Sequence, residues 1–490
     1  MRRQIPPRSQ PAPSSLPMST LRSLTPFEQL LLRDQRPAFP MCFFILCTVE
    51  GPLDVHRLRG ALERAARRHP LLCSRVRDAW WRPSWQAPDV VPVLEAFPRG
   101  SPPPGVSDAP WRSIDIRRTS GVRMVAIERE RDAWEVVLMI QHVACDGLSG
   151  LEFLGDVWSE YHGSEPAPFR TPARDVRRRS GSPAAVAAPS AVHPSTPPPE
   201  QAPTDSGSTA SDLGGETARF AGFLPAMLAR GPALPPFPPR SSAPPGAGPS
   251  LPFAAVAFTA EETTSIKQRA AANGASLNDV AVAAVMRAVA AWNEDAGHPA
   301  RQIRITMPAS LKSPGTRAPA CNDMGYAFLD RTVEQCRAPV ELIRSLAIAS
   351  RWIQEHRAAG TFLDTLAIID RFPPALWLLT RLPVPLSTAV VSFVGNVGPR
   401  LRANVPRDGG CDLPGGLRIS AVKGVPPIRP GTRLGVGLVI YDGRLHVTVL
   451  GDVHALGEAA PPLLAAAIRA AILDCTASLP TATITAVTSA

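Results

Sequence analysis

The stretch AWEVVLMIQHVACDG, residues 133–147, decides the fold. It begins with a mostly apolar run, which is typical of a buried β-strand, and His142 follows at the end of that run. Asp146 and Gly147 then form a tight turn before the segment LEFLGDVWSEYHG, which we expect to be a helix. Ser149 and Glu152 have the spacing of a capping box for that helix. The pattern therefore predicts a histidine on a loop held between a strand and a helix.

A histidine at such a position can transfer protons at neutral pH. The unperturbed pKa of imidazole is about 6.5, and proton transfer needs only hydrogen-bond reach to a hydroxyl or an amine. We therefore predict His142 as a general base, with Asp146 and Gly147 bracing its loop. Two other interpretations stay open. His142 could be a hydrogen-bonded histidine at a strand end, or Cys145 could be a nucleophile, although no Cys-His signature surrounds it.

Outward from this stretch, strand patterns and helix patterns alternate, which predicts a mixed α/β fold. A charged turn joins the strand at 133–141 to a preceding strand at 122–129, as in a hairpin. Further strands are expected at 43–51, 254–258, 301–310, 324–333, 387–398, 432–441 and 443–452. Helices are expected at 24–32, 55–72, 259–273, 277–293, 338–356 and 461–479.

The composition divides the chain into two ordered halves. Residues 18–162 form the first predicted lobe and residues 251–480 the second. Residues 163–250 are rich in proline and poor in periodic apolar residues, which predicts a largely disordered linker. Residues 1–17 are expected to be a disordered extension and residues 481–490 a tail.

Several classes of protein are disfavoured by the whole-chain properties. The formal charge of +10 is not accompanied by a nucleic-acid-binding motif, so we expect no nucleic-acid partner. Eight cysteines without a C-x-x-C pair predict a reduced, cytoplasmic protein. The start lacks the apolar core of a secretory signal, and the apolar stretch at 376–394 is interrupted by Arg381 and prolines, so no transmembrane segment is expected. No closely spaced ligand set predicts a metal.

Several segments in a fixed order resemble one acyltransferase superfamily. In the first half these are GPLDVHRLRGALERAARRHPLLCSRV (51–76) and QHVACDG (141–147). In the second half they are LNDVAVAAV (277–285), RITMPASLKSPG (304–315), SFVGNVGPR (392–400) and LGVGLVIYDGRLHVTVLGD (434–452). Together they resemble the condensation superfamily, which includes chloramphenicol acetyltransferase-like enzymes and peptide condensation domains. The second half most resembles the bacterial wax ester synthase/diacylglycerol acyltransferase branch.

This resemblance implies two chloramphenicol acetyltransferase-like lobes with mixed sheets and an active-site tunnel at their junction. His142 would deprotonate an acceptor that attacks the thioester directly, without an acyl-enzyme. Asp146 would be structural and paired with an arginine that follows the RHPLL segment, but Cys73 stands at that position. Arg75, on the same strand face, is expected to substitute. Gln141 stands where many relatives have a first histidine, and it is a candidate to line the tunnel or to polarise the carbonyl.

Other residues are secondary candidates for the tunnel. Asn278 and Asp279 match an N-D motif whose side chains could polarise the thioester carbonyl, although helix capping is the simpler interpretation. Ser392 and Asn396 belong to the SFVGNVG segment, which also suits a strand-ending turn. We expect the tryptophans in RDAWWRPSW to cover the edge of a core rather than to line a channel, namely Trp80, Trp81 and Trp85.

The predicted function is an acyltransferase that moves an acyl group from a coenzyme A or carrier-protein thioester to an alcohol, and less readily to an amine. Wax ester or acylglycerol synthesis is one candidate. An amide-forming condensation enzyme of a peptide or polyketide pathway is an alternative, and a catalytically degenerate scaffold is another. We expect no bound cofactor, a carrier protein as a possible partner, and at most peripheral contact with membranes.

Overall fold

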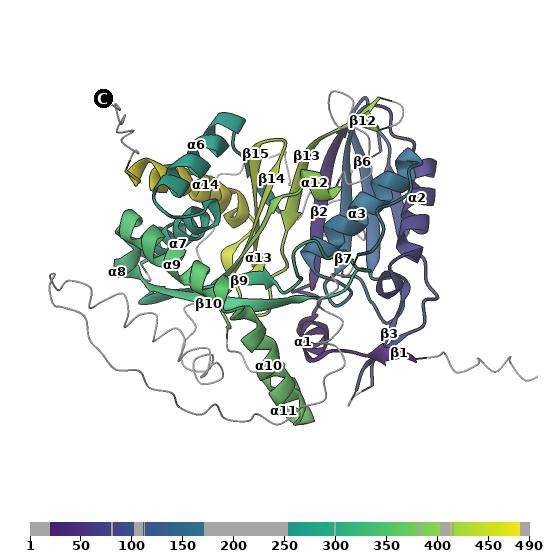
Figure 1. Ribbon diagram of the computed structural model, residues 1–490, viewed down its shortest axis with the longest axis horizontal. Coiled ribbons are helices and arrows are strands. Elements are labelled where there is room, and N and C mark those ends of the chain that lie inside the picture. Colours follow the sequence, from purple (N-terminus) through teal and green to yellow (C-terminus); the bar gives the residue numbers. More distant parts are fainter. Residues whose placement is uncertain are drawn as a thin grey trace, which may run out of the picture.

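Two mixed β-sheets, each with its own helices, form two lobes that lie side by side (Figure 1). The computed structural model describes residues 20–79, 82–101, 111, 113–170, 253–297, 300–381, 385–401, 412–413 and 416–480. The predicted extension at 1–17, the tail at 481–490, Trp80, Trp81 and most of the predicted linker lie outside these residues. The two-lobed α/β fold class is confirmed.

The sheet of the N-terminal lobe has the strand order β12-β13-β2-β7-β6-β5. Its strands are β2 (Cys42–Glu50), β5 (Val93–Phe97), β6 (Val122–Glu130), β7 (Ala133–Gln141), β12 (Asp412–Leu413) and β13 (Leu417–Val425). A small second sheet contains β1 (Thr20–Ser23), β3 (Val76–Arg77) and β4 (Ser84–Gln86). The helices are α1 (Pro26–Asp34), α2 (Val55–Arg67), α3 (Gly147–His162) and a 3-10 turn at Pro70–Cys73.

The sheet of the C-terminal lobe has the order β10-β9-β11-β14-β15-β8. Its strands are β8 (Ala254–Ala257), β9 (Gln302–Ser310), β10 (Met324–Thr332), β11 (Ala389–Asn396), β14 (Leu434–Tyr441) and β15 (Arg444–Gly451). The larger helices are α6 (Ala260–Ala272), α7 (Leu277–Asp295), α9 (Pro339–Glu355), α10 (Ala359–Asp370), α11 (Pro373–Arg381) and α14 (Ala460–Ser478). Single turns of helix occur at α8 (Val333–Cys336), α12 (Gly398–Leu401) and α13 (Val453–Leu456).

Helix α2 illustrates how the sequence dictates an element. Asp54 caps its N-terminus by accepting a hydrogen bond from the main-chain N–H of Arg57 at 3.0 Å. Five buried residues then recur at helical spacing, so that one face packs against the N-terminal sheet and α3: Leu58, Ala61, Leu62, Ala65 and Ala66. The predicted helix is confirmed.

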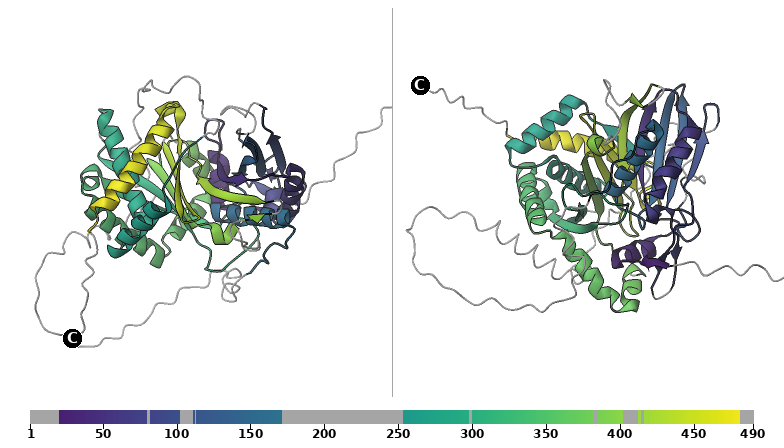
Figure 2. Two further views of the ribbon diagram at one scale, coloured as in Figure 1. Left: turned by 90° about the horizontal axis from the view of Figure 1, so that it is seen from above. Right: turned by 45° about the vertical axis from the view of Figure 1, so that its right-hand side comes forward.

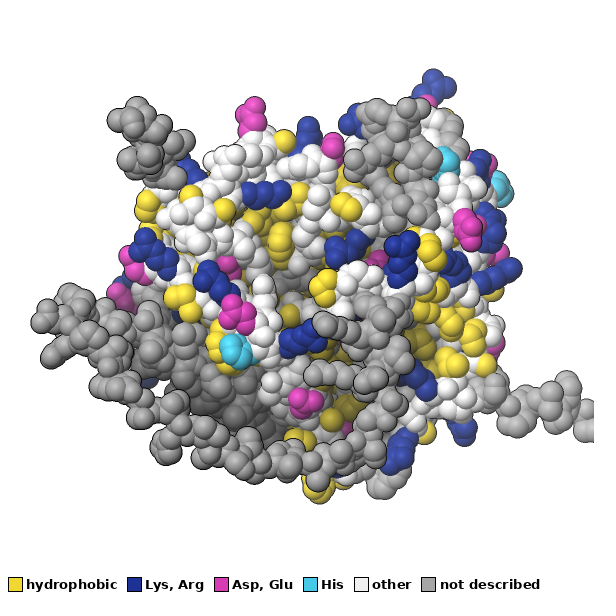
Figure 3. Space-filling view, in the orientation of Figure 1, with side chains coloured by type: hydrophobic (Ala, Val, Ile, Leu, Met, Phe, Trp, Pro, Cys, Tyr) yellow, Lys and Arg dark blue, Asp and Glu magenta, His cyan; other side chains and the backbone are white. Residues whose placement is uncertain are grey.

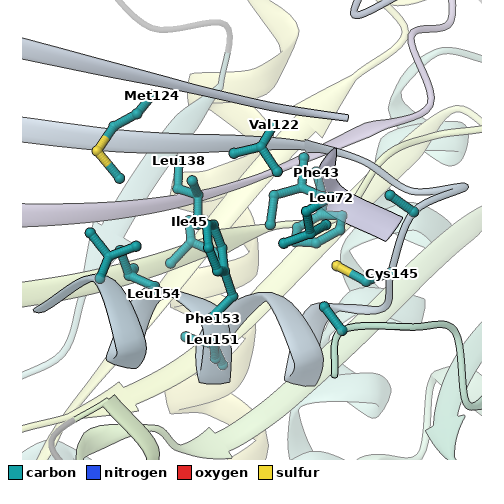
Figure 4. Packing of buried hydrophobic residues seen from close by; sticks show 14 of the residues in the cluster. Phe43, Ile45, Leu72, Val122, Met124, Leu138, Cys145, Leu151, Phe153 and Leu154 are labelled. Carbon is teal, nitrogen blue, oxygen red and sulfur yellow. The ribbon is translucent and has the colours of Figure 1, made fainter. Parts of the chain in front are cut away.

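The core of the N-terminal lobe lies between its sheet and α3. Figure 4 shows Phe153 and Leu154 of α3 facing Leu138 and Met124 of the neighbouring strands, with Phe43 and Ile45 of β2 beside them. The other face of this sheet also packs, through Phe44 and its neighbours, onto the second lobe. Because both faces are covered, the central strands are continuous apolar runs. Trp85 is fully buried in the first core, as predicted for a core position.

Strand β13 corrects the predicted division of the chain. The second lobe was expected to comprise residues 251–480, but β13 pairs antiparallel with β2 and completes the N-terminal sheet. Tyr441 of β14 donates a hydrogen bond to the carbonyl of Ile419 in β13 at 3.1 Å, which ties the second sheet to the first. The two lobes are therefore interleaved in sequence, as the views in Figure 2 also show.

The start of the predicted linker also differs from expectation. Helix α3 ends at His162 with Gly163 in the left-handed conformation (φ 87°), where glycine carries no Cβ penalty. Residues 164–170 continue along the protein, and Arg170 forms a β-bridge with Arg317 of the C-terminal lobe. These residues therefore belong to the folded lobes.

Candidate active site

A cavity of about 650 Å³ lies where the two lobes meet. The N-terminal lobe lines it with β2 and the first turn of α3. The C-terminal lobe contributes β9, β10, β11 and β14, and the shared strand β13 completes the wall. The cavity is in the predicted place, at the junction of the lobes.

His142 lines this cavity at the end of β7. Its main-chain N–H donates to the carbonyl of Met41 at 2.8 Å, and the side chain of Asn322 donates to the His142 carbonyl at 2.9 Å. The ring packs edge-on against Phe43, with 5.2 Å between centroids. A side chain at Gly150 would lie 2.8 Å from Cε2 of Phe43, so this glycine leaves room for the ring that positions the histidine. The backbone of His142 is thus fixed from both lobes.

The environment of His142 favours its neutral form. Burial lowers the pKa of the imidazole below its ordinary 6.5, and its own carbonyl and Asp146 only partly oppose this effect. Nδ1 is buried without a hydrogen-bond partner among the described residues. His142 is 7% exposed and lines the cavity, so part of the ring reaches the space between the lobes. At neutral pH the ring is therefore an uncharged base open to a ligand.

Asp146 braces the loop, but through a different cap from the one predicted. It is the N-cap of α3, and its Oδ1 accepts from the N–H of Ser149 at 2.8 Å. Its Oδ2 accepts from the N–H of Asp323 at 2.9 Å, which fastens the loop to the C-terminal lobe. The predicted capping box of Ser149 and Glu152 is wrong, because the helix begins at Gly147, two residues before Ser149.

The prediction that Arg75 pairs with Asp146 is also wrong. Arg75 instead bonds to Asp89 through both of its guanidinium branches, near the surface. The buried cation beside Asp146 is Lys312, which sequence reasoning missed. Its ammonium donates to the Ser149 hydroxyl at 2.7 Å and lies 3.7 Å from a Glu152 carboxylate oxygen.

Lys312 remains charged although its side chain is only 7% exposed. Burial works to lower its pKa, but Asp146 and Glu152 outweigh that effect and raise the pKa above its usual value. Lys312 also lines the cavity. The segment that contains it, at 304–315, carried part of the resemblance, but nothing local showed that this lysine would reach α3.

The RHPLL segment meets a different carboxylate on α3. Arg68 bonds to Asp156 at 2.9 Å, and Nε2 of His69 lies 3.1 Å from the same oxygen. Nδ1 of His69 accepts from the N–H of Ala320 at 2.9 Å, so the ring is neutral and donates through Nε2. Arg317 also bonds to Asp156. This buried cluster joins α2, α3 and the C-terminal lobe, and it does not line the cavity.

Gln141 and Cys145 do not line the cavity. The amide of Gln141 is fully buried, donates to Gln35 at 2.7 Å and accepts from the N–H of Val143 at 3.0 Å. The idea that Gln141 lines the tunnel is therefore wrong, and it shapes the turn instead. Cys145 is fully buried, and burial raises the pKa of its thiol well above 9.0, which disfavours the thiolate that a nucleophile requires.

Asn278 and Asp279 have different positions in the structure: Asp279 caps α7, and Asn278 lines the cavity. Asp279 completes a capping box with Ser276, the N-cap of α7, as the simpler interpretation predicted. Asn278 lines the cavity, where its Nδ2 lies 3.4 Å from the sulfur of Met307. Its Oδ1 is buried without a hydrogen-bond partner among the described residues. The amide has two N–H donors and Met307 engages only one, so Asn278 stays a candidate for contact with a ligand or for polarising the thioester carbonyl.

Of Ser392 and Asn396, only Ser392 lines the cavity. Ser392 of β11 lines the cavity. Asn396 is exposed and accepts from the N–H of Gly398 at 3.2 Å, beside Gly395 in the left-handed conformation. The tunnel role of Asn396 is therefore wrong, and the turn interpretation holds.

The described residues contain no group of three or more His, Cys, Asp or Glu side chains that could hold a metal ion. One helix in this part of the chain, α14, is long and apolar enough to cross a membrane, and 44% of it is buried within the protein. It packs against α7, β15 and β8, as core helices of the same composition do. Figure 3 shows basic side chains scattered over the visible face among acidic and apolar ones.

Sequence comparison identifies two similar curated proteins. Both are uncharacterised proteins of Mycobacterium tuberculosis, from strains H37Rv and CDC 1551, and each is 26% identical over 470 residues. The similarity covers 93% of this chain and 99% of each relative. No family model matches the sequence.

Comparison with solved structures shows the fold. The first condensation domain of the calcium-dependent antibiotic synthetase, in complex with a substrate analogue, has a TM-score of 0.61 at 15% identity, over 94% of this chain and 97% of that one. Trichothecene 15-O-acetyltransferase from Fusarium sporotrichioides has a TM-score of 0.60 at 11% identity, over 93% and 95%. Polyketide synthase associated protein 5 from Mycobacterium tuberculosis has a TM-score of 0.54 at 17% identity, over 94% and 99%. The chain therefore has the two-lobed fold shared by condensation domains and this acetyltransferase.

Proposed function

We propose that the protein is an acyltransferase that moves an acyl group from a thioester to a hydroxyl, with His142 as the general base. One observation carries the proposal. His142, whose backbone is held by both lobes and whose burial favours the neutral ring, lines the cavity at their junction. The likeness of the fold to condensation domains and to an O-acetyltransferase supports the same class of reaction.

The proposed reaction needs only this base and the two substrates. The hydroxyl proton passes to Nε2 of His142 as the hydroxyl oxygen attacks the thioester carbonyl carbon. The tetrahedral intermediate then collapses, the carbon–sulfur bond breaks, and the departing thiolate takes the proton back from His142. No acyl-enzyme forms, and the residue returns to its starting state. The buried Cys145 takes no part.

The walls of the cavity suggest the nature of the acyl group. Many are apolar, including Phe43, Leu151, Met307, Tyr326 and Phe393. Such a surface favours an extended hydrocarbon group, because burying apolar area is worth about 25 cal/mol per Å². We therefore propose a lipid-like acyl thioester of coenzyme A or of a carrier protein, with wax ester or acylglycerol formation as one case.

Amide formation is a second candidate. It is favoured by the likeness to a condensation domain, since the fold of that domain fits this chain as well as that of the acetyltransferase does. The same base would serve an amine acceptor. Only the identity of the acceptor, alcohol or amine, therefore distinguishes the two candidate functions.

The test is turnover by the purified protein with a panel of acyl thioesters, each paired with an alcohol or an amine. Free thiol and product mass are read together, so that simple hydrolysis is distinguished from transfer. We expect the His142→Ala variant to lose about 100- to 10,000-fold in rate, which is the usual contribution of a general base. His56→Ala, on the exposed side of α2, is the matched control and should keep full rate.

Two results would contradict the proposal. Unchanged turnover in a folded His142→Ala variant would exclude the histidine as the base. An absence of turnover with every pair, by a folded wild-type protein, would favour a scaffold that keeps the fold without the reaction.

A further inference from the structure

Cationic side chains dominate the charged groups that line the cavity. Among the described residues, five cationic side chains line it, and the only carboxylate is that of Asp146, which already accepts two hydrogen bonds. The cationic residues are Lys312, Arg357, Arg400, Lys423 and Arg429. The side chains that line the cavity therefore carry a net positive charge.

Two of these cations have partners within the protein. Lys312 meets Ser149 and Glu152, and Arg429 forms an ion pair with Asp34. In the part of the chain that the structure describes, the side chains of Arg357, Arg400 and Lys423 have neither an ion pair nor a hydrogen bond. Arg357 and Arg400 are exposed, so water solvates them. Lys423 is partly buried.

Lys423 lies on β13, directly opposite Leu46 of β2. His142 aligns with Met41, the residue before β2, so the two positions are roughly 15 Å apart along the strand at the usual rise per residue. Burial lowers the pKa of Lys423, and Glu135 partly opposes this effect. Glu135 is already engaged by Arg129 at 2.5 Å. A half-buried ammonium without its own counter-ion is costly in an empty cavity.

A buried histidine, His446 of β15, lies close to Lys423 but does not line the cavity. It is 5% exposed. Burial, Lys423 and Arg444 lower the pKa of His446 to about 4, so at neutral pH the ring is uncharged and adds no second positive charge beside Lys423.

We propose that the end of the cavity at Lys423 binds an anionic group of the substrate, a carboxylate or a phosphate, through the Lys423 ammonium. This inference deepens the proposed acyl transfer and rests on it. The anionic group is held about 15 Å along β2 from the position of the reacting base, so it is at the far end of a substrate from the bond that is made. Two sources fit this chemistry: an acyl chain with a terminal carboxylate, or an acceptor that carries the anion.

Binding to the full-length protein by calorimetry tests the inference without relying on turnover. The donor arm compares a dicarboxylic acyl thioester of N-acetylcysteamine, which lacks the phosphates of coenzyme A, with the matching uncharged acyl thioester. The acceptor arm compares a hydroxy acid and a hydroxyalkyl phosphate with the matching plain alcohol. We expect one arm to show a preference of about 10- to 100-fold for the anionic ligand, the range of a charge-assisted hydrogen bond.

The variant Lys423→Met retains the apolar stem and removes the charge. It should abolish the preference for the anionic ligand, leave the binding of the uncharged ligand unchanged, and leave the unfolding temperature equal or higher, because an unpaired half-buried charge is removed. Lys267→Met, on the exposed side of α6, is the matched control and should keep the preference.

The outcomes separate the two proposals. A preference that Lys423→Met abolishes supports the anion site and identifies its source by the arm in which it is seen. Equal binding of charged and uncharged ligands in both arms overturns the anion site, and so does a preference that survives in Lys423→Met. Neither result affects acyl transfer, which is tested separately by turnover of uncharged thioesters.

Discussion

Replacing Asp146 by alanine tests whether this carboxylate is a structural brace. Two main-chain N–H groups would lose their acceptor, those of Ser149 at 2.8 Å and Asp323 at 2.9 Å. Loss of the N-cap of α3 costs about 1 kcal/mol. The buried N–H of Asp323 left without this acceptor costs about 1–3 kcal/mol more. We therefore expect a loss of about 2–4 kcal/mol in the free energy of unfolding.

Urea unfolding followed by circular dichroism measures this loss. With a slope of about 2–3 kcal/mol per M, the midpoint should fall by about 0.7–2 M. Asp146→Asn is the matched control, because asparagine is as good an N-cap as aspartate. Asp146→Asn should recover the part of the unfolding free energy that comes from the N-cap. It should not recover the part that comes from the negative charge beside Lys312.

Transfer activity gives a second readout at a temperature where all variants are folded. Because Asp146 fastens the loop of His142 to the second lobe, we expect the rate constant to fall while binding of the thioester changes little. An Asp146→Ala protein with an unchanged urea midpoint would refute the reasoning, since neither hydrogen bond could then matter.

Three further outcomes are expected. The rate of transfer should be flat above about pH 6.5 and should fall at lower pH, because burial lowers the pKa of His142 and only the neutral ring is a base; a fall that begins above pH 7 in a pH–rate profile would contradict this. Arg75→Ala should change the free energy of unfolding by at most about 1 kcal/mol in urea titration, because Arg75 meets Asp89 near the surface and not Asp146; a loss as large as that of Asp146→Ala would restore the discarded pairing. Iodoacetamide should leave Cys145 unlabelled in the native protein, as read by peptide mass, because the thiol is buried and its pKa is raised; rapid labelling would contradict the buried position.

The local elements could be predicted from the sequence, because their periodicity is local. Helix α2 repeats its apolar residues at helical spacing, and β7 is a continuous apolar run, so each pattern had one simple interpretation. The helices α10 and α11 were not predicted: α11 overlaps the apolar stretch at 376–394, which we considered only as a possible membrane span, and α10 lies just before that stretch. Strand β13 was missed because its partner β2 is more than 360 residues away, and no local pattern encodes such a pairing.

The site residues that lie together on one loop could be predicted from the sequence. Those that come together only when the two lobes meet could not. His142 and Asp146 were found because a strand end, a turn and a helix start follow one another in the chain. Lys312 was missed because it reaches Asp146 only when the lobes are together. The partner of Arg75 was predicted wrongly because strand alternation gives the direction of a side chain but not its neighbours. In the structure Arg75 meets Asp89 and not Asp146.

The pairing of β13 with β2 constrains how this protein is made. On the ribosome, β2 and β7 emerge early, whereas β13 is complete only after residues 142–425 have been added, about 15–55 s later at usual elongation rates. During that time the apolar strand Cys42–Glu50 is an open edge that can pair with another nascent chain. Expression of the first half alone would make this state permanent and yield aggregates, so the two halves should be recovered in soluble form only when they are produced together.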